Sequence, residues 1–117
     1  MLITWFIGVR VPGRAPFQEE KTMFILSDNC IFIDVDDTLV IETKPNYKLI
    51  ETIKEWKDKK KTIILWTSNS GGIKYAVKAA RFCQIEDEVD YIMPKPYVIV
   101  DDDHLEYYRI INPLTLE

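Results

Sequence analysis

The chain has 117 residues, of which 47% are hydrophobic and 29% charged, a composition typical of one soluble globular domain. Its formal net charge of −4 argues against a nucleic-acid-binding protein with a basic surface. No apolar segment approaches the roughly 20 residues of a membrane helix. The two cysteines, Cys30 and Cys83, lack the spacing of a disulfide framework or a metal site, so we expect reduced thiols in a cytoplasmic protein.

Residues 1–28 differ from the rest of the chain. The segment "VRVPGRAPFQEEK" contains two prolines and a glycine and shows no periodic pattern, which predicts a loop. We expect residues 1–28 to form a flexible N-terminal arm or extension, with an edge strand in "LITWFIGV" as the alternative. Residues 29–117 then form the compact domain.

From residue 29 onward, apolar runs alternate with helical patterns. The predicted strands are "CIFIDV", "KTIILW" (61–66), "VDYIM" (89–93) and "YVIV" (97–100), and the predicted helices lie in "KPNYKLIETIKEWKDKKK" and "SNSGGIKYAVKAARFC". Continuous apolar runs are typical of parallel strands that are covered on both faces. The order predicts an α/β fold, a Rossmann-like open parallel sheet with right-handed crossovers and helices on both faces.

Polar side chains follow each predicted strand. They are Asp34, Asp36, Asp37 and Thr38 after the first strand, Thr67, Ser68 and Asn69 after the second, Lys95 after the third, and Asp101, Asp102 and Asp103 after the fourth. Each residue alone has an ordinary structural explanation, such as a turn or a helix cap. Ligands of open α/β sheets bind at the carboxyl ends of the strands, so the coincidence at four ends indicates a site.

Charge and spacing indicate the chemistry of that site. Two acidic clusters in one cleft repel each other, and one amine cannot balance them, whereas Mg²⁺ suits carboxylates, water and a phosphate oxygen. In an extended chain, Asp34 and Asp36 point the same way about 6–7 Å apart, which leaves room for a phosphoryl group. Carboxylates also act as nucleophiles through aspartyl-phosphate intermediates.

Four motifs resemble those of the haloacid dehalogenase-like (HAD) hydrolase superfamily. The first motif, a hydrophobic strand followed by DxDx[TV], corresponds to "IFIDVDDTLV", and the second, a strand ending in Thr or Ser, corresponds to "TIILWT". The third is the lysine of "MPKP", and the fourth is the acidic strand end of "YVIVDDD". Order and approximate spacing agree from residue 31 to residue 103.

The resemblance implies a role for each matching residue. Asp34 would be the nucleophile, Asp36 the general acid and base, and Lys95 would hold the nucleophile and the phosphoryl oxygens. The substrate phosphate would contact Thr67, Ser68, Asn69 and Lys95. The Mg²⁺ ligands would be Asp34, the backbone carbonyl of Asp36, Asp101 and Asp102. Three contiguous acids depart from the wider spacing of the family's fourth motif, which leaves open which two of residues 101–103 serve the metal.

The intervals between motifs are each filled by about one helix, so no cap domain is expected. An uncapped site implies either bulky phosphorylated substrates, such as proteins or phosphorylated nucleic-acid ends, or closure by a homo-oligomer. The predicted function is a Mg²⁺-dependent phosphatase with no membrane partner.

Two alternatives stand beside this prediction. One is a non-catalytic HAD-fold module that binds metal and phosphate. The other is a receiver-like phospho-acceptor domain, which also uses Asp, Thr, Lys and Mg²⁺. The order of the motifs disfavours the receiver, because there an acidic pair ends the first strand and the phosphorylated Asp ends the middle strand. Here the second strand ends in Thr67.

Overall fold

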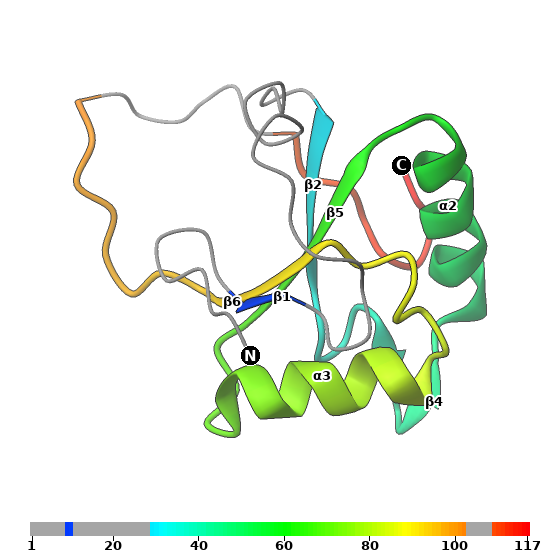
Figure 1. The fold of residues 1–117 in the computed structure, drawn as a ribbon, viewed down its shortest axis with the longest axis horizontal. Helices are drawn as coiled ribbons and strands as arrows, with labels where there is room; N and C mark the ends of the chain where they lie inside the picture. The colour runs from blue at the N-terminus through cyan, green and yellow to red at the C-terminus, as the bar shows by residue number, and fades with distance from the viewer. Residues whose placement is uncertain (1–8, 11–28, 103–108) are drawn as a thin grey trace.

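The computed structural model describes residues 9–10, 29–102 and 109–117. Its main sheet has the strand order β1-β6-β5-β2, in which β2, β5 and β6 are parallel and β1 is antiparallel at the edge (Figure 1). The elements are β1 (Val9–Arg10), β2 (Cys30–Asp34), β3 (Val40–Ile41), β4 (Lys44–Pro45), α2 (Tyr47–Asp58), β5 (Thr62–Thr67), α3 (Gly72–Phe82) and β6 (Tyr91–Pro94). Three of the predicted parallel strands and both predicted helices are confirmed.

The core lies between the sheet and the two helices. Alternate residues of the strands, Ile33, Ile63, Leu65 and Ile92, point to one face and join a single buried cluster. The same cluster takes Leu49, Ile50 and Ile53 from α2 and Ala76, Ala79 and Ala80 from α3. The helical periodicity of the sequence therefore predicts the buried helix faces correctly.

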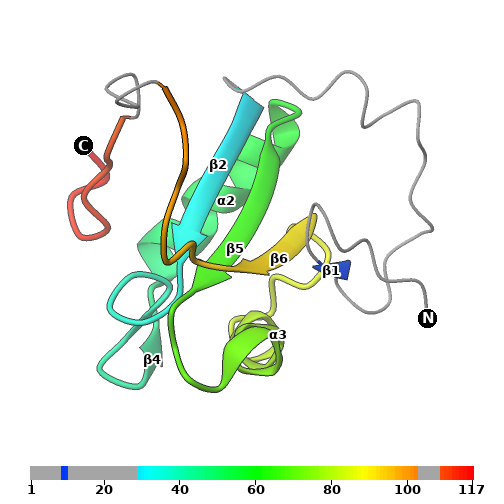
Figure 2. The ribbon, with the colours of Figure 1, turned by 90° about the vertical axis from the view of Figure 1, so that its left-hand side faces the viewer.

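Because both described helices pack on that one face, the prediction of helices on both faces is wrong for the described part of the chain. The physical reason is the strand order. The strands β2, β5 and β6 lie side by side in chain order (Figure 2), so both crossovers run in the same direction. Two right-handed crossovers in one direction place their helices on the same side of a sheet.

The opposite face of the sheet carries aromatic side chains. Phe32 of β2 is 43% exposed, and its ring lies 4.7 Å from the ring of Trp66 on β5, centroid to centroid. Tilted aromatic pairs at this distance are favourable beyond the area that they bury. Asp34, the predicted nucleophile, follows Phe32 by two residues and so lies on this same face at the end of β2.

Residues 97–100 do not form the predicted fourth strand. The chain leaves β6 through Pro94 and Pro96 and runs away from the sheet (Figure 1). Tyr97 and Val100 are 100% and 97% exposed, and Val98 and Ile99 are also exposed. An apolar run of β-forming residues becomes a strand only when it pairs with a neighbour, and the described part of the chain gives this run none.

Among residues 1–28, the structure describes Val9–Arg10, which pair with β6 through Ile92 and Tyr91. The other residues of the predicted N-terminal arm lie outside the described residues, as does Asp103. Neither described helix combines the length and hydropathy needed to cross a bilayer.

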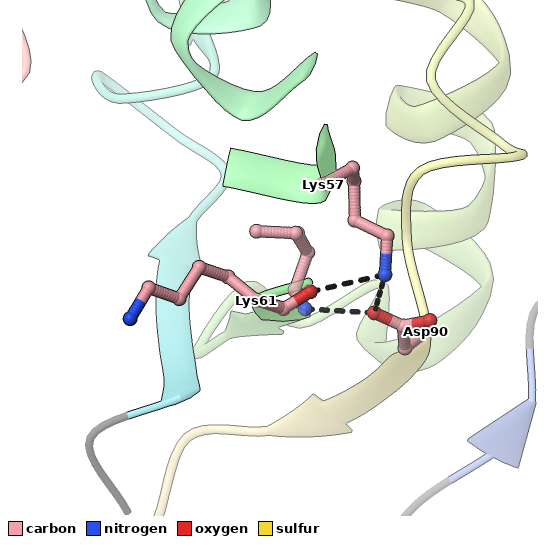
Figure 3. Close-up of polar contacts among 4 residues, drawn as sticks. Lys57, Lys61 and Asp90 are labelled. Atoms are coloured by element: carbon pink, nitrogen blue, oxygen red, sulfur yellow. Dashed lines mark hydrogen bonds and ion pairs between the residues drawn. The ribbon is translucent and has the colours of Figure 1, made fainter. Parts of the chain in front are cut away.

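Hydrogen bonds to Asp90 connect α2, β5 and the start of β6 at the amino ends of the strands (Figure 3). Asp90 Oδ2 accepts hydrogen bonds from Lys57 Nζ at 2.7 Å and from the backbone N–H of Ile63 at 2.8 Å. Lys57 Nζ also donates to the carbonyl of Lys61 at 3.0 Å. One carboxylate thus fixes the end of a helix against two strands, far along the sheet from the predicted site.

Candidate functional site

Asp34 ends β2 and meets Lys95 across the carboxyl edge of the sheet. The nearest oxygen, Oδ1 of Asp34, lies 3.5 Å from Lys95 Nζ. The side chains are 30% and 35% exposed, respectively, so the pair is screened by water and contributes at most about 1 kcal/mol to stability. Its significance is positional, because a carboxylate and an ammonium group meet where open sheets bind ligands.

Trp66 forms the floor between these two groups. The sheet register places Asp34 beside Trp66 and Trp66 beside Met93, two residues before Lys95. Lys95 Nζ lies 5.7 Å from the centroid of a Trp66 ring, within the range of a cation–π contact. Trp66 is only half-buried and lies at the site.

The segment after β2 closes into a single tight turn that exposes Asp36. The carbonyl of Val35 accepts backbone hydrogen bonds from residues 38–40 at 3.0–3.3 Å, and Asp37 N donates to Val40 O at 2.9 Å. Asp37 has a φ of 61°, a left-handed conformation that Asp tolerates well. Asp37 is therefore a turn residue.

Asn46 ties this turn to the rest of the domain. Its Nδ2 donates to Thr38 O and to Pro113 O, both at 2.9 Å, while its Oδ1 accepts from Leu49 N and caps α2. The backbone N–H of Asn46 donates to Leu39 O at 2.8 Å. Asn46 therefore fixes the later part of the turn that carries Asp36.

The carboxylate of Asp36 is held by two donors from the β5–α3 region. Tyr75 Oη donates to Oδ1, and Asn69 Nδ2 donates to Oδ2 at 3.0 Å. These hydrogen bonds, that of Tyr75 first, lower the pKa of Asp36, because they stabilise its charged form. The same contact raises the pKa of Tyr75. The arrangement holds Asp36 as a carboxylate, the form that accepts a proton.

Thr67 ends β5 and is 3% exposed. Its Oγ1 accepts a hydrogen bond from Asn69 N at 3.0 Å, and its carbonyl accepts one from Lys95 N at 2.9 Å. A hydroxyl that accepts from a neighbour still has its own hydrogen to donate. Thr67 thus fixes the backbone of Asn69 and Lys95 and can bind an anionic oxygen.

A hollow of about 400 Å³ opens beside these groups. It is lined by Thr67, Ser68, Asn69, Gly72, Pro94, Lys95, Pro96 and Tyr97. The lining includes all four residues predicted to contact the substrate phosphate.

The structure does not bring Asp101 and Asp102 to Asp34. Both lie on the exposed segment that leaves β6. Within residues 9–10, 29–102 and 109–117, no group of three or more His, Cys, Asp or Glu side chains could hold a metal ion. The described arrangement therefore does not fit Mg²⁺, and Asp34 faces Lys95 instead.

The sequence places Asp34, Asp36, Thr67, Asn69 and Lys95 correctly at one edge of the sheet. The sequence does not reveal the role of Tyr75. Its neighbours Ile73, Ala76 and Val77 indicate only that it lies in a helix. No residue spacing signals that a tyrosine of α3 reaches the turn after β2.

Comparison of the chain with protein-family models, with curated proteins and with solved structures finds no match.

Proposed function

We propose that this protein is a phosphatase that cleaves phosphomonoesters through an aspartyl-phosphate on Asp34. The observation that carries the proposal is the Asp34–Lys95 contact of 3.5 Å beside Thr67, at the carboxyl edge of a parallel sheet. The order of the four motifs, which resembles that of HAD hydrolases, supports it independently.

The proposed reaction has two displacements. An oxygen of Asp34 attacks phosphorus, the bond from phosphorus to the ester oxygen breaks, and Asp36 gives its proton to the departing oxygen. Asp36 then takes a proton from a water whose oxygen attacks the phosphoryl group, which releases inorganic phosphate and restores Asp34. The charge of an incoming phosphate opposes ionisation of Asp36 and so favours its acid form. Lys95 and Thr67 hold the phosphoryl oxygens.

We include Mg²⁺ in the proposal as an ion bound only when Asp101 and Asp102 approach Asp34. Such an ion would neutralise charge on the phosphoryl group. The exposed apolar residues 97–100 support this movement, since β2 lies at the end of the strand order among the described strands. Pairing parallel to β2 would carry the two acids to the end of β2 that holds Asp34.

The open hollow supports a bulky phosphorylated substrate, such as a protein or a phosphorylated nucleic-acid end, as does the lack of any long segment between the motifs. A homo-oligomer that closes the site is the alternative. Neither cysteine forms a disulfide, which supports a reducing compartment such as the cytoplasm.

A second candidate is a metal- and phosphate-binding module without turnover. The observation that favours it is the position of Asp101 and Asp102 on the exposed segment. The two candidates differ in one respect, namely whether phosphate is released.

Phosphate release from p-nitrophenyl phosphate and from a panel of phosphomonoesters, with Mg²⁺ or with EDTA, tests the proposal. We expect Mg²⁺-dependent release by the wild type and only background release by Asp34→Asn. The matched control is Asp37→Asn, the same change three residues on, which keeps a residue suited to the left-handed φ. Equal release by the wild type and Asp34→Asn would refute the nucleophile. Phosphate binding without release would favour the module.

A further inference from the structure

Both oxygens of the Asp36 carboxylate are engaged by side chains that the four motifs do not explain. Tyr75, on α3, donates from Oη to Oδ1. Asn69, in the loop before α3, donates from Nδ2 to Oδ2 at a distance of 3.0 Å. Asp36 itself is exposed and lies in a turn, so packing does little to fix its side chain. These two hydrogen bonds therefore set the direction of the carboxylate.

The two donors are themselves held in place. Asn69 Oδ1 accepts from Gly71 N at 2.7 Å, which fixes the amide so that Nδ2 faces Asp36. The ring of Tyr75 packs against the core cluster. A Cβ on Gly71 would lie 2.9 Å from Tyr75 Cβ and 3.1 Å from Asn69 Oδ1, so only glycine allows this close approach.

We propose that Tyr75, supported by Asn69, is a positioning residue that directs Asp36 at the leaving-group oxygen. This proposal rests on the proposed phosphatase function, because it assigns Tyr75 a part in the proton transfer by Asp36. A phenolic hydroxyl suits this part, since its hydrogen rotates. Tyr75 can donate to an oxygen of the carboxylate, and the oxygens of the protonated acid keep lone pairs that accept the same bond while the acid's own hydrogen faces the leaving oxygen. The contact with Tyr75 thus persists through both displacements.

A misdirected Asp36 affects substrates unequally. Phenyl phosphate has a basic leaving oxygen, so cleavage of its ester bond needs the proton from Asp36. Dinitrophenyl phosphate has a leaving group that departs as a stable anion, and its cleavage needs no proton. In the second displacement Asp36 accepts a proton from water whatever the substrate was. Loss of positioning therefore changes kcat/KM for one ester and kcat for both.

The experiment compares wild type, Tyr75→Phe and the control Tyr47→Phe on the two esters. Tyr47 is an exposed tyrosine at the start of α2, so the control removes a hydroxyl away from Asp36. For Tyr75→Phe we expect kcat/KM for phenyl phosphate to fall about tenfold, part of the 10²–10⁴-fold that general acid catalysis supplies, and that for dinitrophenyl phosphate to change less than about twofold. We expect Tyr47→Phe to match the wild type on both esters.

The outcomes separate this proposal from the proposed function. Inactivity of the wild type on both esters would refute the phosphatase. If the wild type is active and Tyr75→Phe shows equal losses of kcat/KM on the two esters, or no loss, the positioning role alone is refuted. Asn69→Ala provides a second variant, for use if Tyr75→Phe unfolds. Loss of its phosphate contact lowers kcat/KM for both esters, and loss of its hydrogen bond to Asp36 should lower kcat/KM for phenyl phosphate further. Equal losses there would again refute the positioning role.

Discussion

Replacing Asp90 by alanine should destabilise the domain without changing its chemistry. The carboxylate holds three segments together, since Lys57 of α2 and the backbone N–H of Ile63 in β5 both donate to its Oδ2 just before β6 begins. It lies at the amino ends of the strands, whereas the candidate site lies at their carboxyl ends. Stability and activity should therefore respond separately.

Two contributions set the expected magnitude. The N–H of Ile63, a fully buried residue, loses its side-chain acceptor, and a buried donor left without an acceptor costs about 1–3 kcal/mol. The Lys57–Asp90 ion pair has side chains 26% and 16% exposed, so it is partly screened and contributes about 1 kcal/mol. Together they predict a loss of about 2–4 kcal/mol in the free energy of unfolding for Asp90→Ala.

Urea unfolding followed by circular dichroism measures this loss. Asp90→Asn keeps an acceptor for Ile63 N–H and should lose only the ion-pair contribution, whereas Lys57→Met also loses the hydrogen bond to Lys61 O. A double-mutant cycle between these two variants should give a coupling of about 1 kcal/mol. Asp58→Ala, a change of an exposed acid at the end of the same helix, is the control. A loss below about 0.5 kcal/mol for Asp90→Ala, which is the range of ordinary surface substitutions, would refute the reasoning.

The remaining predictions concern Gly71 and Cys83. Gly71→Ala places a methyl group against Tyr75 and Asn69, so it should reproduce the unequal loss of kcat/KM on phenyl and dinitrophenyl phosphate. The control is Gly72→Ala, whose methyl group meets open space but whose φ of +67° is strained for alanine. This control should lower the free energy of unfolding by about 1 kcal/mol without changing the ratio of the two kcat/KM values. An unchanged ratio for Gly71→Ala in the phosphatase assay would contradict the crowding argument. Burial raises the pKa of Cys83 from 9.0 to about 11. The unfolded thiol ionises first as the pH rises, so stability should fall by up to about 1.4 kcal/mol per pH unit between these values. Urea unfolding at rising pH should show a smaller fall for Cys83→Ala, and an equal fall in both proteins would count against this assignment.

Sequence patterns predict what depends on periodicity and strand ends. The apolar runs before Asp34 and Thr67 fix two buried strands, and parallel pairing then brings these residues and Lys95 to one edge. The β3–β4 hairpin escapes prediction because its turn residues, Glu42 and Thr43, have φ values of 49° and 67° without the Gly, Asn or Asp that signals such a turn.

Two further features depend on the path of the backbone rather than on local pattern. Tyr75 reaches Asp36 because the loop before α3 bends closely around Gly71, and no periodicity encodes that bend. Residues 97–100 have the composition of a strand, but strand formation requires a partner and not only propensity. Sequence alone therefore overstates the sheet and misses the contact that holds Asp36.

Charge explains why the position of residues 97–102 matters for the proposed function. Asp34 and Asp36 together carry two negative charges, and Lys95 is the cation whose side chain contacts Asp34. A phosphate monoester brings about two further negative charges, and like charges in a partly desolvated site repel strongly. A divalent cation offsets this repulsion, and its ligands must come from acids that reach the end of β2. Asp101 and Asp102 follow a four-residue apolar segment that has the length to lie along β2, so pairing of that segment would couple assembly of the sheet edge to binding of the ion.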